Sequence, residues 1–264
     1  MNIIKFLESL SSEDMTKTTA SRRESFGQLG QIGKNLAFAS IPFGLAALSN
    51  KTYANDITAT PSDPVGALTL ALVLEYLENE FYETALSTTG LIVPGRERNV
   101  FTQIAAHEAD HVTFIKNGLM ANNAAVPAKP TFDFTVGGVF DPFGDYQTFL
   151  QFAQAFEDTG VRAYKGQAGN LISTPDLLTY ALQIHSVEAR HASEVRRIRG
   201  LKGWISNDVS GLNAAFDASY AGEGNTDQAG YNTAALFGAA AGSESFDEPL
   251  TTAQSVAIAN IFIV

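Results

Sequence analysis

The chain contains four stretches in which apolar residues recur every three or four positions, which is the spacing of one face of an α-helix. The first stretch opens with Asp63-Pro64, a pair that favours a helix start because Asp caps free N–H groups and Pro fits the first turn. Short connections make neighbouring helices antiparallel, so the pattern predicts an all-α fold, a four-helix bundle. The predicted helices cover residues 63–87, 97–121, 145–169 and 174–201.

Two regions depart from this pattern. Residues 122–144 contain three Pro, a Gly-Gly pair and several Phe, which predicts a long crossover between the second and third helices with Phe side chains over the core edge. Residues 204–264 are rich in Gly and Ala, and residues 217–232 within them read as loop. We expect this C-terminal extension to pack on the bundle; a contact between copies in a homo-oligomer is the alternative.

Two of the predicted helices carry the same pair of polar residues on their apolar faces. Glu108 and His111 are three residues apart, so on a helix they lie about 60° apart around the axis and roughly 4.5 Å apart along it. Glu188 and His191 repeat this Glu-x-x-His spacing. A carboxylate and an imidazole that project from one face can bind one metal ion, and two such helices can converge on a metal pair.

The two other helices contribute to the same repeat. Each has a glutamate on its apolar face, followed seven residues later by a tyrosine: Glu75 and Tyr82, then Glu157 and Tyr164. The order of the motifs is therefore the same in both halves of the bundle. Such a repeat gives the bundle a pseudo-twofold axis, and we expect the metal pair to lie on it.

Buried carboxylates are costly unless they are paired or bind metal. With no cysteine in the chain, any metal must use carboxylate and imidazole, which suits iron, manganese or zinc. We predict two divalent metal ions in a centre suited to the activation of O₂ or peroxide. A buried hydrogen-bonded network without metal is the competing interpretation. The six predicted ligands are Glu75, Glu108, His111, Glu157, Glu188 and His191.

Glu78 has two interpretations. It lies one turn after Glu75 on nearly the same face, but its counterpart in the other half is Gly160. It is either a seventh, asymmetric ligand or a partly exposed residue near the edge of the bundle.

Four further residues are candidates for contact with the ligands. Asp110 and Arg190 each precede a ligand histidine, and they form either a pair that orients the imidazoles or a surface ion pair. Tyr82 and Tyr164 are either redox-active residues near the metals or ordinary core tyrosines. We expect the remaining histidines, His107 and His185, to form hydrogen bonds rather than to bind metal.

One motif supports a different function. Residues 107–111 read H-E-x-x-H, the spacing of zinc proteases, in which two histidines bind zinc and the glutamate acts as base. In the second motif His185 lies six residues before His191, so it cannot copy that geometry. The feature that both motifs share is Glu-x-x-His, which makes a zinc metalloprotease the minor alternative.

The N-terminus has the features of a twin-arginine signal segment. Arg22-Arg23 precede a mostly apolar run, residues 35–48, and Thr52-Tyr53-Ala54 offers small residues for cleavage. We expect export to the periplasm, with an uncleaved anchor or an ordinary amphipathic helix as the alternative. The expected parts are a signal segment at 1–54, the bundle at 55–203 and the extension at 204–264.

Charge and hydropathy exclude two classes of partner. The net charge of −11 argues against nucleic acid, whose phosphates need a basic surface. The N-terminal apolar run is too short, and too broken by Pro42 and Gly44, for a comfortable membrane span, and we expect no stable span in the mature chain. A basic cluster, Arg196 to Lys202, fits the negative C-terminal end of the fourth helix.

The motifs together resemble the ferritin-like superfamily of di-iron carboxylate bundles. The resemblance rests on LEYLENEFY (74–82), EADH (108–111), Glu157 and EARH (188–191), and it covers about residues 63–203. Within the superfamily the chain is most similar to exported bacterial ferritin-like domain proteins related to plant desiccation-related proteins, and the tail motif SESFDEPLT (243–251) adds to the likeness.

The resemblance implies a four-helix bundle with a di-iron or di-manganese centre. Ferroxidase, peroxidase and catalase-like activities occur across the superfamily, but for this branch the resemblance suggests no settled substrate and no storage cage. The leading hypothesis is a redox protein that oxidises Fe(II) or consumes peroxide. The alternative is a non-catalytic stress or desiccation protein whose metal site is structural, so whether the protein is an enzyme stays open.

Overall fold

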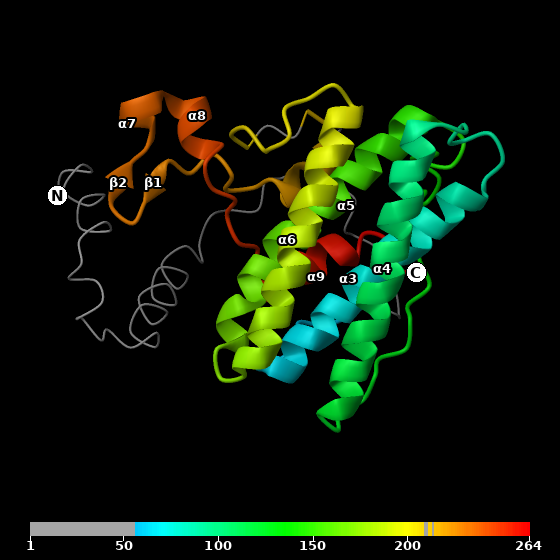
Figure 1. The fold of residues 1–264 in the computed structure, drawn as a ribbon, viewed down its shortest axis with the longest axis horizontal. Helices are drawn as coiled ribbons and strands as arrows, with labels where there is room; N and C mark the ends of the chain where they lie inside the picture. The colour runs from blue at the N-terminus through cyan, green and yellow to red at the C-terminus, as the bar shows by residue number, and fades with distance from the viewer. Residues whose placement is uncertain (1–55, 209–210, 213) are drawn as a thin grey trace.

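The computed structural model describes residues 56–208, 211–212 and 214–264, and the predicted signal segment at 1–54 lies outside the described residues. Four long helices form the bundle (Figure 1), which confirms the predicted all-α fold. No helix within the described ranges is both long enough and apolar enough to span a membrane. The bundle helices are α3 (Pro64–Ser87), α4 (Arg96–Ala121), α5 (Tyr146–Gln167) and α6 (Pro175–Ile198).

The third and fourth helices end earlier than predicted. The helix expected to reach residue 169 ends at Gln167. The last helix ends at Ile198 rather than at Leu201, because Gly200 takes a φ of +75°, which costs glycine little. The N–H of Leu201 then donates to the carbonyl of Arg196 at 2.9 Å and closes the helix end.

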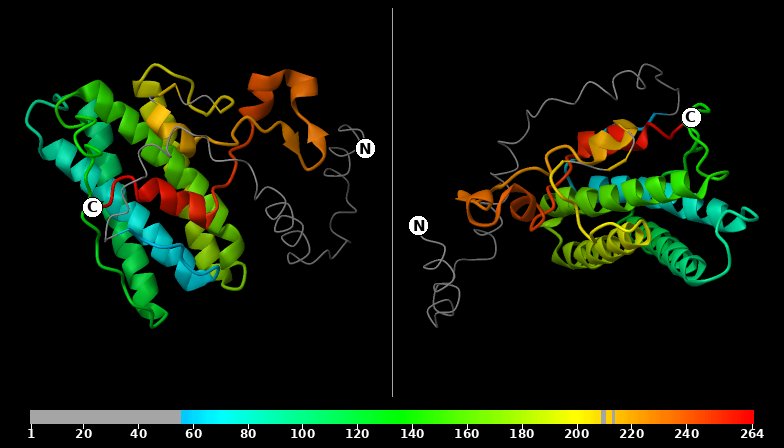
Figure 2. Two further views of the ribbon diagram at one scale, coloured as in Figure 1. Left: turned by 180° about the vertical axis from the view of Figure 1, so that it is seen from behind. Right: turned by 90° about the horizontal axis from the view of Figure 1, so that it is seen from above.

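The helices and the C-terminal extension form three layers. Seen from above (Figure 2), α4 and α6 lie in one layer and α3 and α5 in the next. The outer face of α3 and α5 is covered by α9 (Thr252–Ala259) and the 3₁₀ helix η4 (Ala214–Ser219). Because α3 is enclosed on both sides, most of its residues are buried, which explains its nearly continuous apolar sequence. The extension thus packs on the bundle, as predicted.

The crossover between α4 and α5 closes one side of the core. Phe132 and Phe134 are buried, and the ring of Phe134 lies 5.3 Å from the ring of Phe81 on α3. The N–H of Asp133 donates to the carbonyl of Phe262 at 2.7 Å, so the crossover runs beside the end of the chain. The predicted role of the crossover Phe residues is confirmed.

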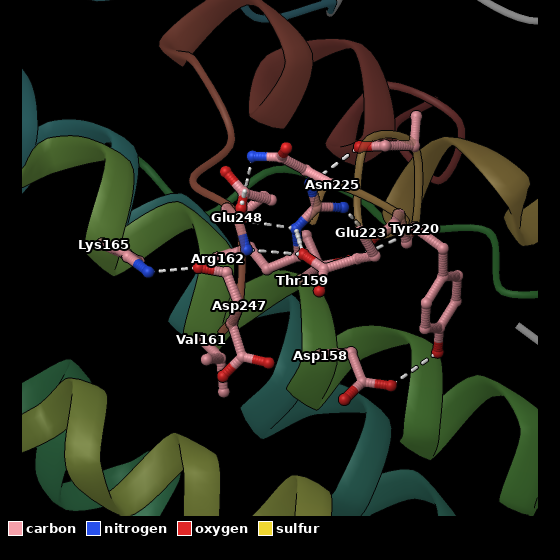
Figure 3. Close-up of polar contacts among 12 residues, drawn as sticks. Asp158, Thr159, Val161, Arg162, Lys165, Tyr220, Glu223, Asn225, Asp247 and Glu248 are labelled. Atoms are coloured by element: carbon pink, nitrogen blue, oxygen red, sulfur yellow. Dashed lines mark hydrogen bonds and ion pairs between the residues drawn. The ribbon is translucent and has the colours of Figure 1, made fainter. Parts of the chain in front are cut away.

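A buried arginine fastens the extension to α5 (Figure 3). The guanidinium of Arg162 donates to the carbonyls of Ser219, Ala221 and Glu248 at 2.5, 2.8 and 2.7 Å, and its Nε lies 2.6 Å from the carboxylate of Glu223. Both side chains of this ion pair are 1% exposed. The backbone also approaches closely, since the N–H of Leu250 donates to the carbonyl of Arg162 at 3.0 Å.

The extension contains more regular structure than its sequence indicated. Residues 217–232, predicted as loop, include the end of η4 and a two-stranded antiparallel hairpin. Ala229 and Gly230, with φ of 53° and 83°, form its turn. The remaining short elements are η3 (Ala168–Leu171), β1 (Asp227–Gln228), β2 (Tyr231–Asn232), α7 (Ala234–Phe237) and α8 (Ala239–Ser243).

The basic cluster at the end of α6 does more than complement the helix dipole. Arg196 is buried and pairs with Asp158 of α5, and Asp158 also accepts a hydrogen bond from the hydroxyl of Tyr220 at 2.6 Å. Arg199 donates to the side chain of Gln154. These contacts join α5, α6 and the extension, a tertiary role that helical periodicity alone did not predict.

Candidate metal centre

All seven predicted ligand residues lie buried in the bundle: Glu75 and Glu78 on α3, Glu108 and His111 on α4, Glu157 on α5, and Glu188 and His191 on α6. Six of them form two groups whose potential ligand atoms all lie within 4.8 Å of one another. Glu108 and Glu188 belong to both groups. The groups are Glu75, Glu108, His111 and Glu188, and Glu108, Glu157, Glu188 and His191.

The first group is arranged around the Nδ1 atom of His111. That nitrogen lies 3.2 Å from Glu75 Oε2, 3.0 Å from Glu108 Oε2 and 3.2 Å from Glu188 Oε1. Three carboxylates from three helices therefore converge on one imidazole nitrogen, as the ligands of one ion would.

The second group repeats this arrangement around His191. Its Nδ1 lies 2.9 Å from Glu108 Oε1 and 3.2 Å from Glu157 Oε2. Glu108 thus presents one oxygen to each histidine and lies between the two groups. The pseudo-twofold repeat in the sequence corresponds to a repeat in space.

Several of these atoms lack a hydrogen-bond partner among the described residues although they are buried. They include both carboxylate oxygens of Glu188, Oε1 of Glu108, Oε2 of Glu157 and Nδ1 of His191. A histidine nitrogen or a carboxylate oxygen lies close to some of these atoms, but the angles at these contacts are outside the range of a hydrogen bond. Leaving such atoms unsatisfied in the interior is costly. A cation between them would satisfy them, so this donor set fits a metal ion.

The electrostatics of the group agree with a site built for cations. Burial raises the pKa of Glu75 to about 7, and burial with the charge of neighbouring glutamates raises the pKa of Glu188 well above its usual range. Although burial favours the neutral ring of His191, the charges of Glu157 and Glu188 and the close carboxylate of Glu108 raise its pKa to about 11. Without metal, protons on the imidazoles therefore offset the crowded carboxylate charge.

Two tyrosines hold the carboxylates that belong to only one group each. The hydroxyl of Tyr82 on α3 donates to Glu157 on α5, and the hydroxyl of Tyr164 on α5 donates to Glu75 on α3. All four side chains are buried. The tyrosines thus cross between the halves and fix the two outer carboxylates, a position in direct contact with the predicted ligands.

Glu78 is 3% exposed, which excludes the partly exposed position considered for it. It belongs to neither group of converging atoms. Burial and the charges of Glu188 and Glu75 raise its pKa well above the usual range for a carboxyl. Glu78 is therefore a buried neighbour of the groups, and its neutral form is favoured in the absence of metal.

Asp110 and Arg190 do not pair with each other, either beside the ligands or at the surface. Both are exposed, and in the part of the chain that the structure describes they share no ion pair and bind no candidate ligand. The physical reason is the helix rotation of about 100° per residue, which turns the position before each ligand histidine away from the centre.

The other two histidines form hydrogen bonds, as expected. Nδ1 of His107 lies 2.8 Å from Nε2 of His191, and Nδ1 of His185 lies 2.9 Å from the carbonyl of Val161. His107 belongs to neither group of converging atoms. The structure therefore does not bring the two histidines of H-E-x-x-H together at one site, which counts against a zinc protease.

A cavity of about 190 Å³ lies between α4 and α6 on one side of the centre. Val100, Ile104 and Val187 line it with apolar side chains, and His107 and His191 line it with imidazoles. Because His191 also belongs to the second group, the cavity adjoins that half of the centre. Sequence reasoning did not identify this cavity, since it depends on the separation of two helices.

Comparison with known proteins is consistent with the bundle and its buried groups. A family model described as a ferritin-like domain matches residues 63–201. No curated protein and no solved structure matches the chain. The matched region contains all four bundle helices and every residue of the two groups.

Proposed function

Because the chain belongs to the family of ferritin-like domains, we propose that its buried centre holds two iron ions and that the protein oxidises Fe(II) or consumes peroxide. The observation that carries the proposal is the overlap of the two groups. Glu108 and Glu188 are common to both, so they would help to hold both ions. Glu75 and His111 would hold one ion, and Glu157 and His191 would hold the other. Manganese is the alternative metal, since the same donor types suit it.

When bound, two iron ions would supply electrons to O₂ or peroxide by passing from Fe(II) to Fe(III). The protein's own residues have other tasks. Tyr82 and Tyr164 hold the outer carboxylates in place through their hydroxyls. His111 and His191 give up the protons that their raised pKa values favour, so that Nδ1 can face an ion. The apolar core around the centre limits the access of water.

Glu78 fits the proposal as a seventh ligand, and the fifth carboxylate, on one side of the pair. It is buried next to both groups, and the charge of Glu188 contributes to its raised pKa. A bound cation would favour its ionised form. We propose that it becomes available to the metal pair on binding, which makes the centre asymmetric.

The test is direct. Metal-free protein is mixed anaerobically with two equivalents of Fe(II) and then exposed to O₂ or to peroxide, while oxidant consumption and Fe(III) absorbance are followed. We expect consumption well above that of Fe(II) in buffer. The control is Glu83→Ala, which changes an exposed glutamate on α3 and should behave like the wild type.

A second candidate, in which the ions only stabilise the bundle, is favoured by the deep burial of the centre. Glu75, Glu108, Glu157 and Glu188 are each 0% exposed. This candidate predicts two bound ions and a higher melting temperature, with oxidant consumption no faster than in buffer. Measuring both quantities on one preparation separates the two functions.

We also propose that the protein is exported through a twin-arginine route. Support comes from Arg22-Arg23 and the apolar run at 35–48, which lie outside the described residues. A route of this kind carries folded proteins and suits a bundle that binds its metal first. N-terminal sequencing of the mature protein should begin near Asn55, and an intact Met1 in the soluble cytoplasmic fraction would contradict export.

A further inference from the structure

His107 and Val187 occupy equivalent positions in the two halves of the bundle. Each directly precedes the glutamate of a Glu-x-x-His motif, His107 on α4 and Val187 on α6. Both line the cavity between these helices. The two halves are therefore alike in their candidate ligands but differ at this position, where only one side chain can form a hydrogen bond.

The contact between His107 and His191 determines which nitrogen of His191 is free to bind metal. Nδ1 of His191 faces the carboxylates of Glu108 and Glu157, while its Nε2 lies 2.8 Å from Nδ1 of His107. If Nδ1 is to bind a cation, the ring proton must be on Nε2. That N–H then donates to His107, whose Nδ1 must be the acceptor.

The surroundings of His107 are compatible with this role. With Nδ1 as acceptor, the proton of His107 is on Nε2, which lies 2.8 Å from Nε2 of the Gln103 side chain. Gln103 accepts this proton when its amide is turned so that Oε1, in place of Nε2, faces the ring; only hydrogen-bond partners distinguish the two orientations. In that orientation the three side chains form a chain of hydrogen bonds from the second group to the cavity.

The equivalent nitrogen in the other half has no such partner. The contacts of His111 to Glu75, Glu108 and Glu188 all involve Nδ1. Among the residues that the structure describes, no hydrogen bond reaches its Nε2. Val187, in the position corresponding to His107, has no polar atom on its side chain.

We propose that His107 is a positioning residue for one ion of the pair, because it holds His191 with Nδ1 toward the carboxylates. The second group, around His191, therefore binds its ion more tightly than the first group, around His111. The inference rests on the proposed two-ion centre. It assigns no metal-binding role to His107 itself. Removing groups that orient a ligand histidine typically weakens metal binding 10- to 100-fold.

The test is an anaerobic calorimetric titration of the metal-free full chain with Fe(II). The wild type should bind two ions in two distinguishable steps. His107→Ala should weaken one step by about 10- to 100-fold and leave the other within about threefold. His107→Asn should restore that step, because its amide oxygen lies near the place of Nδ1 and can accept the same hydrogen bond. Val187→Ala, at the equivalent position, should change neither step.

The outcomes separate this inference from the function on which it rests. If the wild type binds two ions and His107→Ala binds both unchanged, the positioning role is wrong and the centre stands. Equal weakening of both steps, or a loss that Asn does not restore, also overturns the role. If the wild type binds no ion, the proposed centre and this inference both fail.

Discussion

Gly160 on α5 leaves the space that Glu78 on α3 occupies. A Cβ atom at Gly160 would lie 3.2 Å from Glu78 Oε1 and 3.0 Å from Glu188 Oε2, tighter than ordinary contact. The two residues are counterparts in the internal repeat. The absence of a side chain on one helix thus accommodates an additional carboxylate from the other, which explains how the centre can be asymmetric although its motifs repeat.

Gly160→Ala should therefore weaken metal binding without unfolding the bundle. The added methyl group forces the carboxylates of Glu78 and Glu188 to move by a few tenths of an ångström. We expect about tenfold weaker Fe(II) binding, similar to the loss of affinity when a group that orients a metal ligand is removed. The cost of overpacking, about 1–3 kcal/mol, is partly offset by the gain of about 0.5–1 kcal/mol for alanine in a helix.

The control for this variant is Gly169→Ala, because an added Cβ at that position meets nothing within 4 Å. Titration calorimetry and thermal unfolding of the two variants are compared with the wild type. Unchanged Fe(II) affinity in Gly160→Ala would show that the space opposite Glu78 is unimportant for the centre.

Metal binding should release protons and strengthen as pH rises. The pKa of His191 is raised to about 11, so its ring is protonated at pH 7 in the metal-free protein, whereas a ligand imidazole must be neutral at the binding nitrogen. His111 is raised further in the same direction, and Glu75, with a pKa of about 7, is partly protonated as well. For each proton that the metal displaces, the metal affinity becomes about tenfold tighter when the pH rises by one unit.

These pKa values define the pH range in which proton release should be observed. Between pH 6 and 8, well below the pKa of His191, we expect at least about two protons released per chain on loading. Calorimetric titrations in buffers of different ionisation enthalpy count them. Heats that do not depend on the buffer would mean that the imidazoles are already neutral, contrary to this account of the metal-free centre.

Much of the architecture and the ligand set followed from the sequence, for identifiable reasons. Helix periodicity placed Glu75, Glu108, Glu157 and Glu188 on apolar faces, and the structure buries all four at one point between the helices. A carboxylate in an apolar stripe is a strong signal because its burial is so costly. The ends of the helices were predicted less accurately. The end of α6, for example, depends on the conformation of Gly200.

Other features depend on distances across the bundle and could not be read from spacing. The hydrogen bond between His107 and His191 joins two residues that lie on different helices and are 84 positions apart in the chain. Asp110 and Arg190 each precede a ligand histidine by one residue, and one step along a helix turns a side chain by about 100°, so both are exposed and form neither of the pairs considered for them. The burial of Glu78 depends on the empty space at Gly160, which only the packed structure reveals.

Arg162 should be a main attachment point of the C-terminal extension. Arg162→Ala removes the cation paired with the buried carboxyl of Glu223 and the Arg162 donors of three carbonyls (Figure 3). Breaking a buried pair in this way typically costs about 3–5 kcal/mol. We expect a loss of unfolding free energy of this size in denaturant titrations, together with faster proteolysis of the extension.

Arg197→Ala is the matched control, because Arg197 lies on the exposed face of α6 and its removal should cost less than about 0.5 kcal/mol. If the two arginine variants were equally stable, the network around Arg162 would not be what holds the extension to the bundle.

The central claim is that one pair of ions lies between the two Glu-x-x-His motifs, with Glu108 and Glu188 shared. Removing either shared carboxylate takes a ligand from both ions, so Glu108→Ala and Glu188→Ala should lose metal to a similar extent. The helices should persist, because remaining carboxylates can take up protons, as the raised pKa of Glu75 and Glu78 indicates.

The most direct test is the metal content of the wild type, Glu108→Ala, Glu188→Ala and His107→Ala, purified in parallel and measured by elemental analysis. The account predicts about two iron ions per wild-type chain, near-complete loss in both glutamate variants and retention of at least one ion in His107→Ala. One zinc ion per chain, lost in His107→Ala and retained in Glu188→Ala, would contradict it.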